Sequence, residues 1–366
     1  MATGNQSRKT SAAKKKKSKA RARIVIFAIE IVIILVMLVV VAKVFKTTEE
    51  VEGPHYAEIE ETQIVINSEV VENPVLKGYW NVALFGVDAT TDSQLYKGSR
   101  SDSMMVASIN LDTGDIKLVS VYRDTYLNQG NDSYRKANNA YSTGGAEQAI
   151  GMLNMNLDLD ISDFVTVNYQ GLIDCIDGLG GVYIDIDEAE IKHINNYQIT
   201  IAKDVLDGDY NPVKETGYQL VDGLQAAAYC RIRYTAGDDF KRAERQREVI
   251  QAIADRAKQA DVSTLTKVFT KVIDNVYTSI SQEDILGMLK EVGNYSIVEE
   301  GGFPHEDMRT VGTIGTKGSC VIPVSLEENV QWLHEFLFED EEYTVSSDVK
   351  DYSQRIEEET SPYIQR

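Results

Sequence analysis

Residues 102–124 read DSMMVASINLDTGDIKLVSVYRD, two runs of apolar and β-branched residues joined by the polar segment 112–115, DTGD. A short turn-forming segment between two such runs predicts a β-hairpin. Just upstream, residues 79–87, YWNVALFGV, form an apolar run that is typical of a buried strand and ends at Asp88. Three neighbouring strands of this kind indicate a sheet at the centre of the fold.

Helix and strand patterns are mixed through the rest of the chain. Apolar residues recur at helical spacing in 144–157, 222–229, 241–260, 262–279, 281–292 and 325–338. Strand-like runs occupy 163–169, 181–186 and 308–323, with a short helix between the first two. Residues 188–216 are polar without a regular period, which predicts an irregular excursion. Strands mixed with helices predict an α/β fold in which one mixed sheet is flanked by helices.

Charge is distributed unevenly along the 366 residues. The chain has 37 Lys and Arg against 57 Asp and Glu, a net charge of −20, which argues against general nucleic-acid binding. Residues 1–23, in contrast, carry nine basic side chains and no acidic one. The three Cys and four His lie far apart without the spacing of zinc ligands, so we interpret them as structural or exposed residues.

An apolar run follows the basic tail. Residues 24–42, IVIFAIEIVIILVMLVVVA, contain Glu30 as their only charge and would reach about 29 Å as a helix, roughly the thickness of a bilayer core. We therefore predict a transmembrane helix over 24–45. The positive-inside rule keeps residues 1–23 in the cytoplasm and places the rest of a single-pass protein outside the cell membrane.

The external part divides by composition. Residues 46–78 are acidic with weak strand character and predict a stalk, and residues 79–338 form one domain. The tail 339–366 holds nine acids against three bases, which predicts disorder. Sparse cysteines in an external domain fit a Gram-positive envelope.

The segment 231–247, RIRYTAGDDFKRAERQR, concentrates six bases within this acidic domain. One interpretation is a solvated helix face with ion pairs such as Lys241–Glu244. At 100° per residue, however, the apolar stripe of Val249, Ile250, Ile253 and Ala257 continues into Gln246, Arg242 and Asp239. Polar residues on a buried stripe need partners, and a helix N-terminus favours an anion. This pattern favours a functional site.

Other charged residues fall at the ends of predicted strands. Arg231 and Arg233 would point to one face if 230–234 is extended, and two guanidinium forks suit phosphate oxygens. The strand ends carry Asp88, Arg100, Asp102, Arg123, Asp124 and, a little later, Lys136. Carboxylates are suited to Mg²⁺ bound together with phosphates. The set predicts a site for phosphate and a hard cation, with scattered surface charges as the alternative.

Known sequence signatures exclude several other chemistries. The chain has no P-loop, no Rossmann fingerprint, no G-x-S-x-G and no H-E-x-x-H. Because ATP is not normally available outside a cell, an external phosphoryl-transfer enzyme needs a substrate that already carries a high-energy bond. A lipid-linked pyrophosphate is such a substrate, and a membrane anchor would keep the enzyme near it.

Several motifs in order resemble the LytR-CpsA-Psr family of cell-envelope enzymes. They are NVALFGVD, RSDSMMVASIN, LVSVYRDTY, KANNAYSTGG, CRIRY and DFKRAERQ, spread over 79–258 behind one predicted anchor. The resemblance implies a transferase of substituted phosphate groups, of the kind that attaches teichoic acid or capsular polysaccharide. It would move a glycopolymer from a polyprenyl-pyrophosphate carrier to peptidoglycan, at the C6 hydroxyl of N-acetylmuramic acid, and form a phosphodiester.

The resemblance also implies roles for individual residues. Asp88 and Asp102 would hold Mg²⁺, with Mn²⁺ as an alternative, and Asp239 would activate the acceptor hydroxyl, with the adjacent Asp238 as an alternative base. The residues implied to cradle the pyrophosphate or orient its neighbours are Arg100, Arg123, Lys136, Arg231, Arg233, Arg242 and Gln246, of which Arg123 and Arg242 are also counted as catalytic. The lipid would lie in a tunnel between sheet and helices, lined from the helices after 144 and 262.

Two other functions remain open for the same residues. Water in place of the sugar hydroxyl would make the protein a lipid-pyrophosphate hydrolase. A non-catalytic protein could bind membrane lipid and act as a regulator, although a cytoplasmic tail of about 23 residues is too short for a folded output domain. The expected partners are the lipid-linked glycan, peptidoglycan and membrane lipid, and not nucleic acid.

Overall fold

The computed structural model describes residues 55–57, 64–71, 73–89, 91–130, 132–206, 208–233, 238–280 and 294–364. The predicted cytoplasmic tail, transmembrane helix 24–45 and helix 281–292 lie outside these residues. Within them, no helix combines the length and the apolar character that crossing a bilayer requires.

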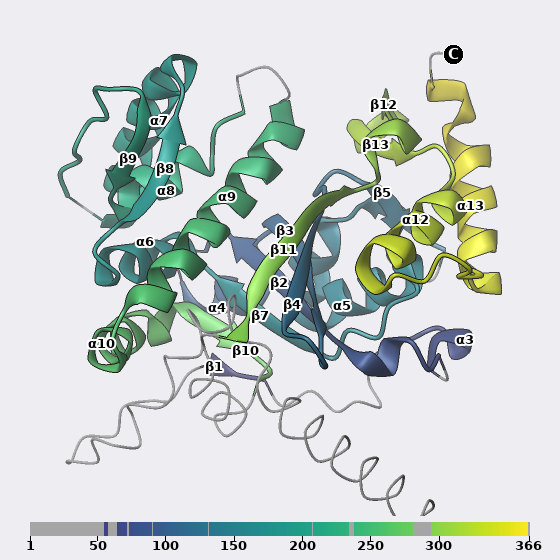
Figure 1. The fold of residues 1–366 in the computed structure, drawn as a ribbon. Coiled ribbons are helices and arrows are strands. Elements are labelled where there is room, and N and C mark those ends of the chain that lie inside the picture. The colour runs from purple at the N-terminus through teal and green to yellow at the C-terminus, as the bar shows by residue number, and fades with distance from the viewer. Residues whose placement is uncertain are drawn as a thin grey trace, which may run out of the picture.

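A mixed seven-stranded sheet forms the centre of the molecule (Figure 1). In order across the sheet, the strands are β1 (His55–Tyr56), β10 (Val276–Thr278), β7 (Asp163–Val167), β2 (Tyr79–Val87), β3 (Ser101–Asn110), β4 (Asp115–Val121) and β11 (Ser296–Phe303). The predicted hairpin is confirmed, because β3 and β4 are antiparallel with Ile109 opposite Ile116. Its turn places Gly114 at a φ of +95°, a conformation that suits a residue without Cβ.

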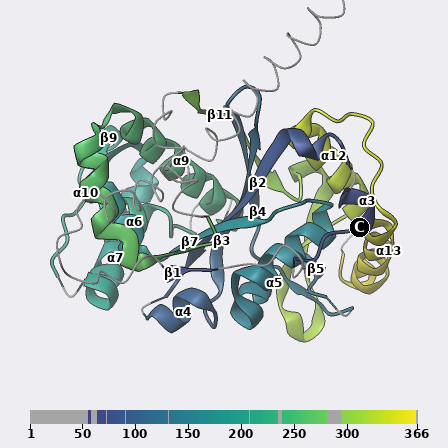
Figure 2. The same ribbon diagram turned by 90° about the horizontal axis from the view of Figure 1, so that it is seen from below.

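Helices cover both faces of the sheet, so the molecule has three layers (Figures 1 and 2). One face carries α6 (Tyr169–Gly178), α8 (Gly223–Tyr229), α9 (Asp238–Gln259) and α10 (Val262–Val272). Beside them lie α7 (Glu188–Ile201) and the antiparallel pair of β8 (Val182–Ile186) and β9 (Gly217–Val221), which α7 connects. The other face carries α5 (Asn139–Leu157), α12 (Leu326–Phe338) and α13 (Ser347–Thr360). The predicted α/β class is confirmed.

Smaller elements complete the second face and its margins. They are α3 (Ser68–Val71), α4 (Asp92–Tyr96), the strand pair β5 (Tyr126–Asn128) and β6 (Tyr134–Lys136), and the strand pair β12 (Arg309–Thr313) and β13 (Ser319–Pro323). Short 3-10 turns occupy Leu76–Gly78, Ile273–Asn275, Glu306–Met308, Gly315–Lys317 and Ser361–Tyr363, and a π-helical turn occupies Ala202–Leu206.

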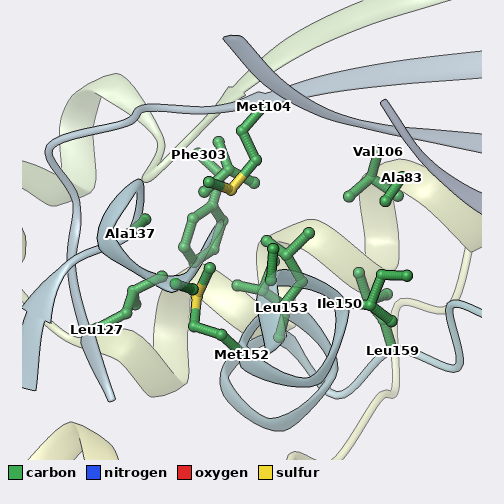
Figure 3. Close-up of a cluster of buried hydrophobic side chains, with 14 of the residues drawn as sticks. Ala83, Met104, Val106, Leu127, Ala137, Ile150, Met152, Leu153, Leu159 and Phe303 are labelled. Atoms are coloured by element: carbon green, nitrogen blue, oxygen red, sulfur yellow. The ribbon is translucent and has the colours of Figure 1, made fainter. Parts of the chain in front are cut away.

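Alternation along the strands divides the apolar residues between two cores. On β2, Val82 and Leu84 face the layer of α6 and α9, whereas Ala83 and Phe85 face the layer of α5. Figure 3 shows part of the second core, where Met104 of β3 and Phe303 of β11 meet Met152 of α5. The two cores hold the sheet between rigid layers, which fixes the edge of the sheet where charged residues gather.

The prediction of a disordered tail over 339–366 is wrong, because half of it forms helix α13. Val349 and Ile356 are buried against the α5 layer, and the Tyr126 hydroxyl donates to Glu359 at 2.7 Å. The acidic composition of the tail indicated disorder but did not show this packing. The acids cover the outer face, while an apolar residue at every third or fourth position provides a stripe for packing.

Three other boundaries differ from the predictions. The irregular excursion predicted at 188–216 begins with the helix α7, whose Ile194 and Ile201 are fully buried. The helix predicted over 262–279 ends at Val272, and its last residues form β10. The stretch 308–323 is two paired strands, β12 and β13.

The described parts of the predicted stalk belong to the domain. His55–Tyr56 form strand β1 of the central sheet. Val70 and Leu76 are buried, and the Asn67 side chain donates to Asp158 at 2.5 Å. The folded domain therefore includes residues 55–57, 64–71 and 73–78 of the predicted stalk.

Candidate active site

Strand ends and one helix N-terminus meet at a single edge of the central sheet. β2, β4 and β7 finish there, and the antiparallel β3 begins there, so Asp88, Arg123, Tyr169 and Asp102 come from four different strand ends. The first turn of α9 brings Asp239 to the same place, where its carboxylate contacts Arg123. Residues that are distant in the sequence thus form one cluster, as predicted.

Three arginines share two carboxylates in this cluster. Arg123 Nη1 lies 2.7 Å from Asp102 Oδ1, and its Nε lies 3.5 Å from Asp239 Oδ2. Arg242 Nη1 lies 3.1 Å from Asp239 Oδ1. Arg233 approaches both carboxylates, at 3.7 Å from Asp102 and 3.6 Å from Asp239. With Asp124, 3.9 Å from Arg123, and Lys136, 3.2 Å from Asp124, four positive groups contact three carboxylates.

The surroundings shift the pKa values of these groups. Burial alone would raise the pKa of Asp102, but the guanidinium groups of Arg123, Arg242 and Arg233 outweigh it and hold that pKa below its usual range. Burial and the neighbouring charge of Arg123 lower the pKa of Arg242 despite the Asp239 carboxylate. Arg242 is thus a cation held in a place that disfavours positive charge.

Several buried polar atoms of the cluster have no hydrogen-bond partner among the described residues. They are Arg242 Nε and Nη1, Arg123 Nε and Asp239 Oδ1. The contact between Arg242 and Asp239 is close enough for an ion pair but is not a hydrogen bond. Buried donors without partners cost free energy, and a bound anion would supply the missing acceptors. The cluster is therefore suited to a polyanion such as a pyrophosphate.

An apolar cavity of about 140 Å³ adjoins the charged cluster. Its walls come from strands β2, β3 and β7 and from helices α6 and α9, including Leu84, Met105, Val165, Leu172, Val249, Ile250 and Ile253. Asp102, Ser103 and Gln246 line both this cavity and the small charged pocket beside it. An elongated apolar chain in the cavity would place an attached anionic group among the arginines.

The cavity confirms the predicted stripe on α9 but corrects the predicted lipid walls. Gln246 lies at the boundary and the apolar residues of the stripe follow it into the cavity. The helices after 144 and 262, α5 and α10, contribute no lining residue to it. α5 packs on the opposite face of the sheet, and α10 is separated from the cavity by α6, against which it packs.

Arg231 is near the site but not in the arrangement predicted for it. The chain turns at Cys230 and Arg231, with φ and ψ of −60° and −18° at Cys230, so it does not begin the extended run predicted from residue 230. Arg231 stacks over the rings of Tyr169, at 5.1 Å, and Tyr197, at 5.6 Å. Sequence reasoning missed Tyr169, although its place directly after a strand that ends at this edge was a usable signal.

The remaining predicted residues are at the margin of the cluster. Lys136 pairs with Asp124 at 3.2 Å, and Asp124 lies 3.9 Å from Arg123. Asp88 and Arg100 are exposed, and Arg100 makes no ion pair with the described residues. The side chain of Asp238 lies outside the described residues.

The two predicted metal ligands fit a cation that phosphate oxygens help to bind. Burial raises the pKa of the Tyr169 phenol, Arg231 opposes this effect, and the charges of Asp102 and Asp88 add to it. No group of three or more His, Cys, Asp or Glu side chains is placed for a metal within the part of the chain that the structure describes. Two carboxylates with substrate phosphates are a usual set for Mg²⁺.

Some of the bases in 231–247 have purely structural contacts. Lys241 pairs with Glu244 at 2.8 Å, as predicted, whereas Arg245 is buried and pairs with Glu190 at 2.7 Å. Arg247 donates to Ser120 at 2.7 Å. The predicted cluster of six bases therefore divides between a site and the packing around it.

A further arginine, Arg309, was not singled out from the sequence. Its guanidinium lies 3.9 Å from the centre of the Phe240 ring and donates to the Tyr122 hydroxyl at 3.0 Å. Phe240 and Tyr122 are the chain neighbours of Asp239 and Arg123. Arg309 thus fixes the backbone on both sides of the cluster, and no local pattern around it indicates this role.

Comparison with known proteins shows the family. The model of the LytR_cpsA_psr family matches residues 38–316, so the chain belongs to the LytR-CpsA-Psr family. A curated relative from Enterococcus faecalis, polyisoprenyl-teichoic acid–peptidoglycan teichoic acid transferase TagU, is 32% identical over 209 residues, which cover 56% of this chain and 63% of that protein. The transferase of the same name from Bacillus mycoides is 28% identical over 258 residues, covering 70% of this chain and 76% of that protein.

Solved structures share the fold. A structure of YwtF (TagT) from Bacillus subtilis with bound octaprenyl pyrophosphate lipid superposes with a TM-score of 0.52 at 21% identity. A second structure, of TagT bound to LIIa-WTA, superposes with a TM-score of 0.56 at 24% identity. The match covers 74% of this chain and 93% of that one. The chain spans just under two thirds of the length of the enterococcal relative.

Proposed function

We propose that the protein is a phosphotransferase that moves a glycopolymer from a polyprenyl-pyrophosphate carrier to a hydroxyl of peptidoglycan, the C6 hydroxyl of N-acetylmuramic acid. The observation that carries the proposal is the continuity of the charged cluster with the apolar cavity. Asp102 and Gln246 line both, so one molecule with an apolar chain and an anionic head would fill the two together. Relatives named as teichoic acid transferases support this class of reaction.

The arginines would hold the pyrophosphate. Arg123, Arg233 and Arg242 share the carboxylates of Asp102 and Asp239. Arg123 and Arg242 also have buried donors without partners among the described residues. Phosphate oxygens would take up these donors, and charge stabilisation by pre-positioned groups is the main source of rate in phosphoryl transfer. Lys136, Arg100 and Arg231 surround this group and would orient the glycan-bearing side.

Asp239 would act as the general base. As the arginines donate to the pyrophosphate, its carboxylate becomes available to accept the proton of the acceptor hydroxyl. The hydroxyl oxygen then bonds to the phosphorus that carries the glycan, and the bond from that phosphorus to the bridging oxygen breaks. Polyprenyl phosphate leaves with the electron pair, and the glycan remains on peptidoglycan through a phosphodiester.

Asp88 and Asp102 would hold Mg²⁺, or Mn²⁺ in its place, together with phosphate oxygens. When bound, the cation supplies positive charge to the oxygens of the pyrophosphate. For the whole protein we propose a single membrane anchor over 24–45 with the catalytic domain outside the cell. That location would give the cavity access to a lipid in the membrane.

The test is a reaction of the purified full-length protein in detergent with a lipid-pyrophosphate-linked glycan, Mg²⁺ and a peptidoglycan oligomer, analysed by mass spectrometry. Glycan phosphate bonded to the oligomer supports the transferase. Free phosphoglycan in place of the conjugate would show a hydrolase, and binding of the lipid without turnover would show a regulator. Either result would overturn the proposal.

A further inference from the structure

A second hollow lies on the other side of α9 from the apolar cavity. It is a groove of about 790 Å³ between α9 and the paired strands β8 and β9. Its lining residues are mostly polar or aromatic and include Tyr183, Asp185, Tyr218, Glu248, Gln251, Asp255 and Arg256. None of these residues belongs to the charged cluster or to the apolar cavity.

Two tyrosines form an aromatic surface on the wall of the groove that strands β8 and β9 provide. The rings of Tyr183 and Tyr218 are stacked, with centroids 5.3 Å apart and planes inclined by 19°. Tyr183 is 42% exposed and Tyr218 is 74% exposed. Large exposed rings side by side offer apolar faces and polar hydroxyls together, which suits a ligand with alternating apolar and hydroxylated surfaces. A chain of sugar rings has this character.

The polar lining completes that chemistry. Asp185 of β8, which is paired with Tyr218 of β9, is exposed. On α9, the Gln251 amide donates to Asp255 at 3.0 Å. Carboxylates and amides at the rim of an aromatic surface are suitable partners for sugar hydroxyl and acetamido groups.

The charge of the groove disfavours a polyanion. The lining contains six carboxylates, of which Glu190 and Glu300 pair with buried arginines. The lining has three cations, Lys241, Arg256 and Lys258, half the number of its carboxylates. Lys241 pairs with Glu244, and Arg256 donates to two backbone carbonyls. The groove therefore presents a mildly acidic wall, in contrast to the arginine cluster on the other side of the helix. An uncharged glycan suits it better than a phosphate polymer.

The groove runs toward the proposed base. Helix α9 lines it from Lys241 to Gln259, a length of about 27 Å. Lys241, at one end, is only two residues after Asp239. A glycan lying along the helix would thus extend toward the charged cluster.

We propose that this groove binds an uncharged glycan strand, and that in the reaction proposed above it holds the strand of the acceptor. This second statement rests on the proposed function, whereas the binding of glycan does not. The two sides of α9 would then separate the substrates, with the anionic donor at the arginines and the acceptor strand along the tyrosines.

The test measures binding of the N-acetylglucosamine hexamer to the full-length protein in detergent by calorimetry. Tyr218→Ala is expected to weaken binding by about tenfold, because one stacking surface is lost. Tyr210→Ala is the control, since Tyr210 is another exposed tyrosine, at 42% against 74% for Tyr218, and does not line the groove. Unchanged affinity in Tyr218→Ala, or tighter binding of poly(glycerol phosphate) that depends on Tyr218, would overturn the proposal. Equal melting temperatures of the two variants show that the fold is intact.

Kinetics separate this inference from the proposed function. If transfer occurs, Tyr218→Ala should raise the KM for the peptidoglycan oligomer and leave the KM for the lipid donor unchanged. Hexamer binding that depends on Tyr218 in a protein without transfer would uphold the groove and refute the reaction. Transfer with an unchanged acceptor KM in Tyr218→Ala would uphold the reaction and refute the acceptor role of the groove.

Discussion

Replacing Arg242 by Met should strongly reduce transfer without destabilising the protein. Arg242 is only 4% exposed, and two of its nitrogens lack hydrogen-bond partners in the described structure. The substitution removes the hydrogen bond from Arg242 to the Asp102 carbonyl at 3.1 Å, worth about 1.5–3 kcal/mol for a charged donor. The ion pair with the 27%-exposed Asp239 adds about 0–1 kcal/mol to the loss.

The gains from this substitution are of similar size. Each buried donor without a partner costs about 1–3 kcal/mol, and both are removed with the guanidinium group. The repulsion from Arg123 and Arg233, which contributes to the lowered pKa of Arg242, also disappears. The free energy of unfolding should therefore stay within about 2 kcal/mol of wild type, on the stabilising side. Loss of one charge-stabilising donor should lower kcat/KM by about 10²–10³-fold.

Arg245→Met on the same helix is the matched control. Arg245 is equally buried, but its Nε donates to Glu190 at 2.7 Å, and Glu190 would be left as a buried charge without that partner. Breaking such a pair costs about 3–5 kcal/mol. Urea unfolding followed by tryptophan fluorescence measures both variants. Equal destabilisation by the two substitutions, or transfer retained in Arg242→Met, would refute the view that Arg242 is held unsatisfied for an anion.

Three further predictions concern the pH dependence, the cavity and the support of the cluster. Burial lowers the pKa of His334 to about 4 from 6.5, so the unfolded chain takes up a proton between these pH values while the folded one does not. The free energy of unfolding should fall by about 3 kcal/mol as the pH drops from 6.5 to 4, and His334→Gln should lack this part of the decrease in a urea titration at several pH values. Ile253→Trp should narrow the apolar cavity and weaken the binding of a long-chain polyprenyl pyrophosphate while inorganic pyrophosphate binds as in wild type; equal loss of both ligands would contradict the location of the lipid. Arg309→Ala should lower kcat more than it raises the donor KM, because it loosens the backbone beside Asp239 and Arg123, and a change in KM alone would argue against this positioning role.

The sequence predicted the parts of the fold that follow from local periodicity. The hairpin around Gly114 and the buried stripe of α9 depend on spacing within a few residues, and both are confirmed. Asp102 and Arg123 were singled out because they lie at strand ends, and Asp239 because it extends the stripe of α9. These features need no knowledge of which distant segments pack together.

The features that were missed depend on tertiary packing. The acidic residues around Ile356 indicated disorder, yet the stripe beneath them packs on the α5 layer. Helical spacing placed Arg242 on the stripe of α9, but the pairing of Arg245 with Glu190 depends on the packing of α7. The lipid walls were assigned to the wrong helices because the sequence does not state which helix covers which face. Tyr169 and Arg309 act through residues far from them in the chain.

The central claim is that the charged cluster and the apolar cavity together hold one polyprenyl pyrophosphate. Mass spectrometry of the lipid that co-purifies with the full-length protein tests it most directly, with Ile253→Trp purified in parallel. The account predicts a polyprenyl phosphate or pyrophosphate with wild type and its depletion from the variant. Membrane phospholipid alone in both samples, or equal polyprenyl lipid in both, would contradict it.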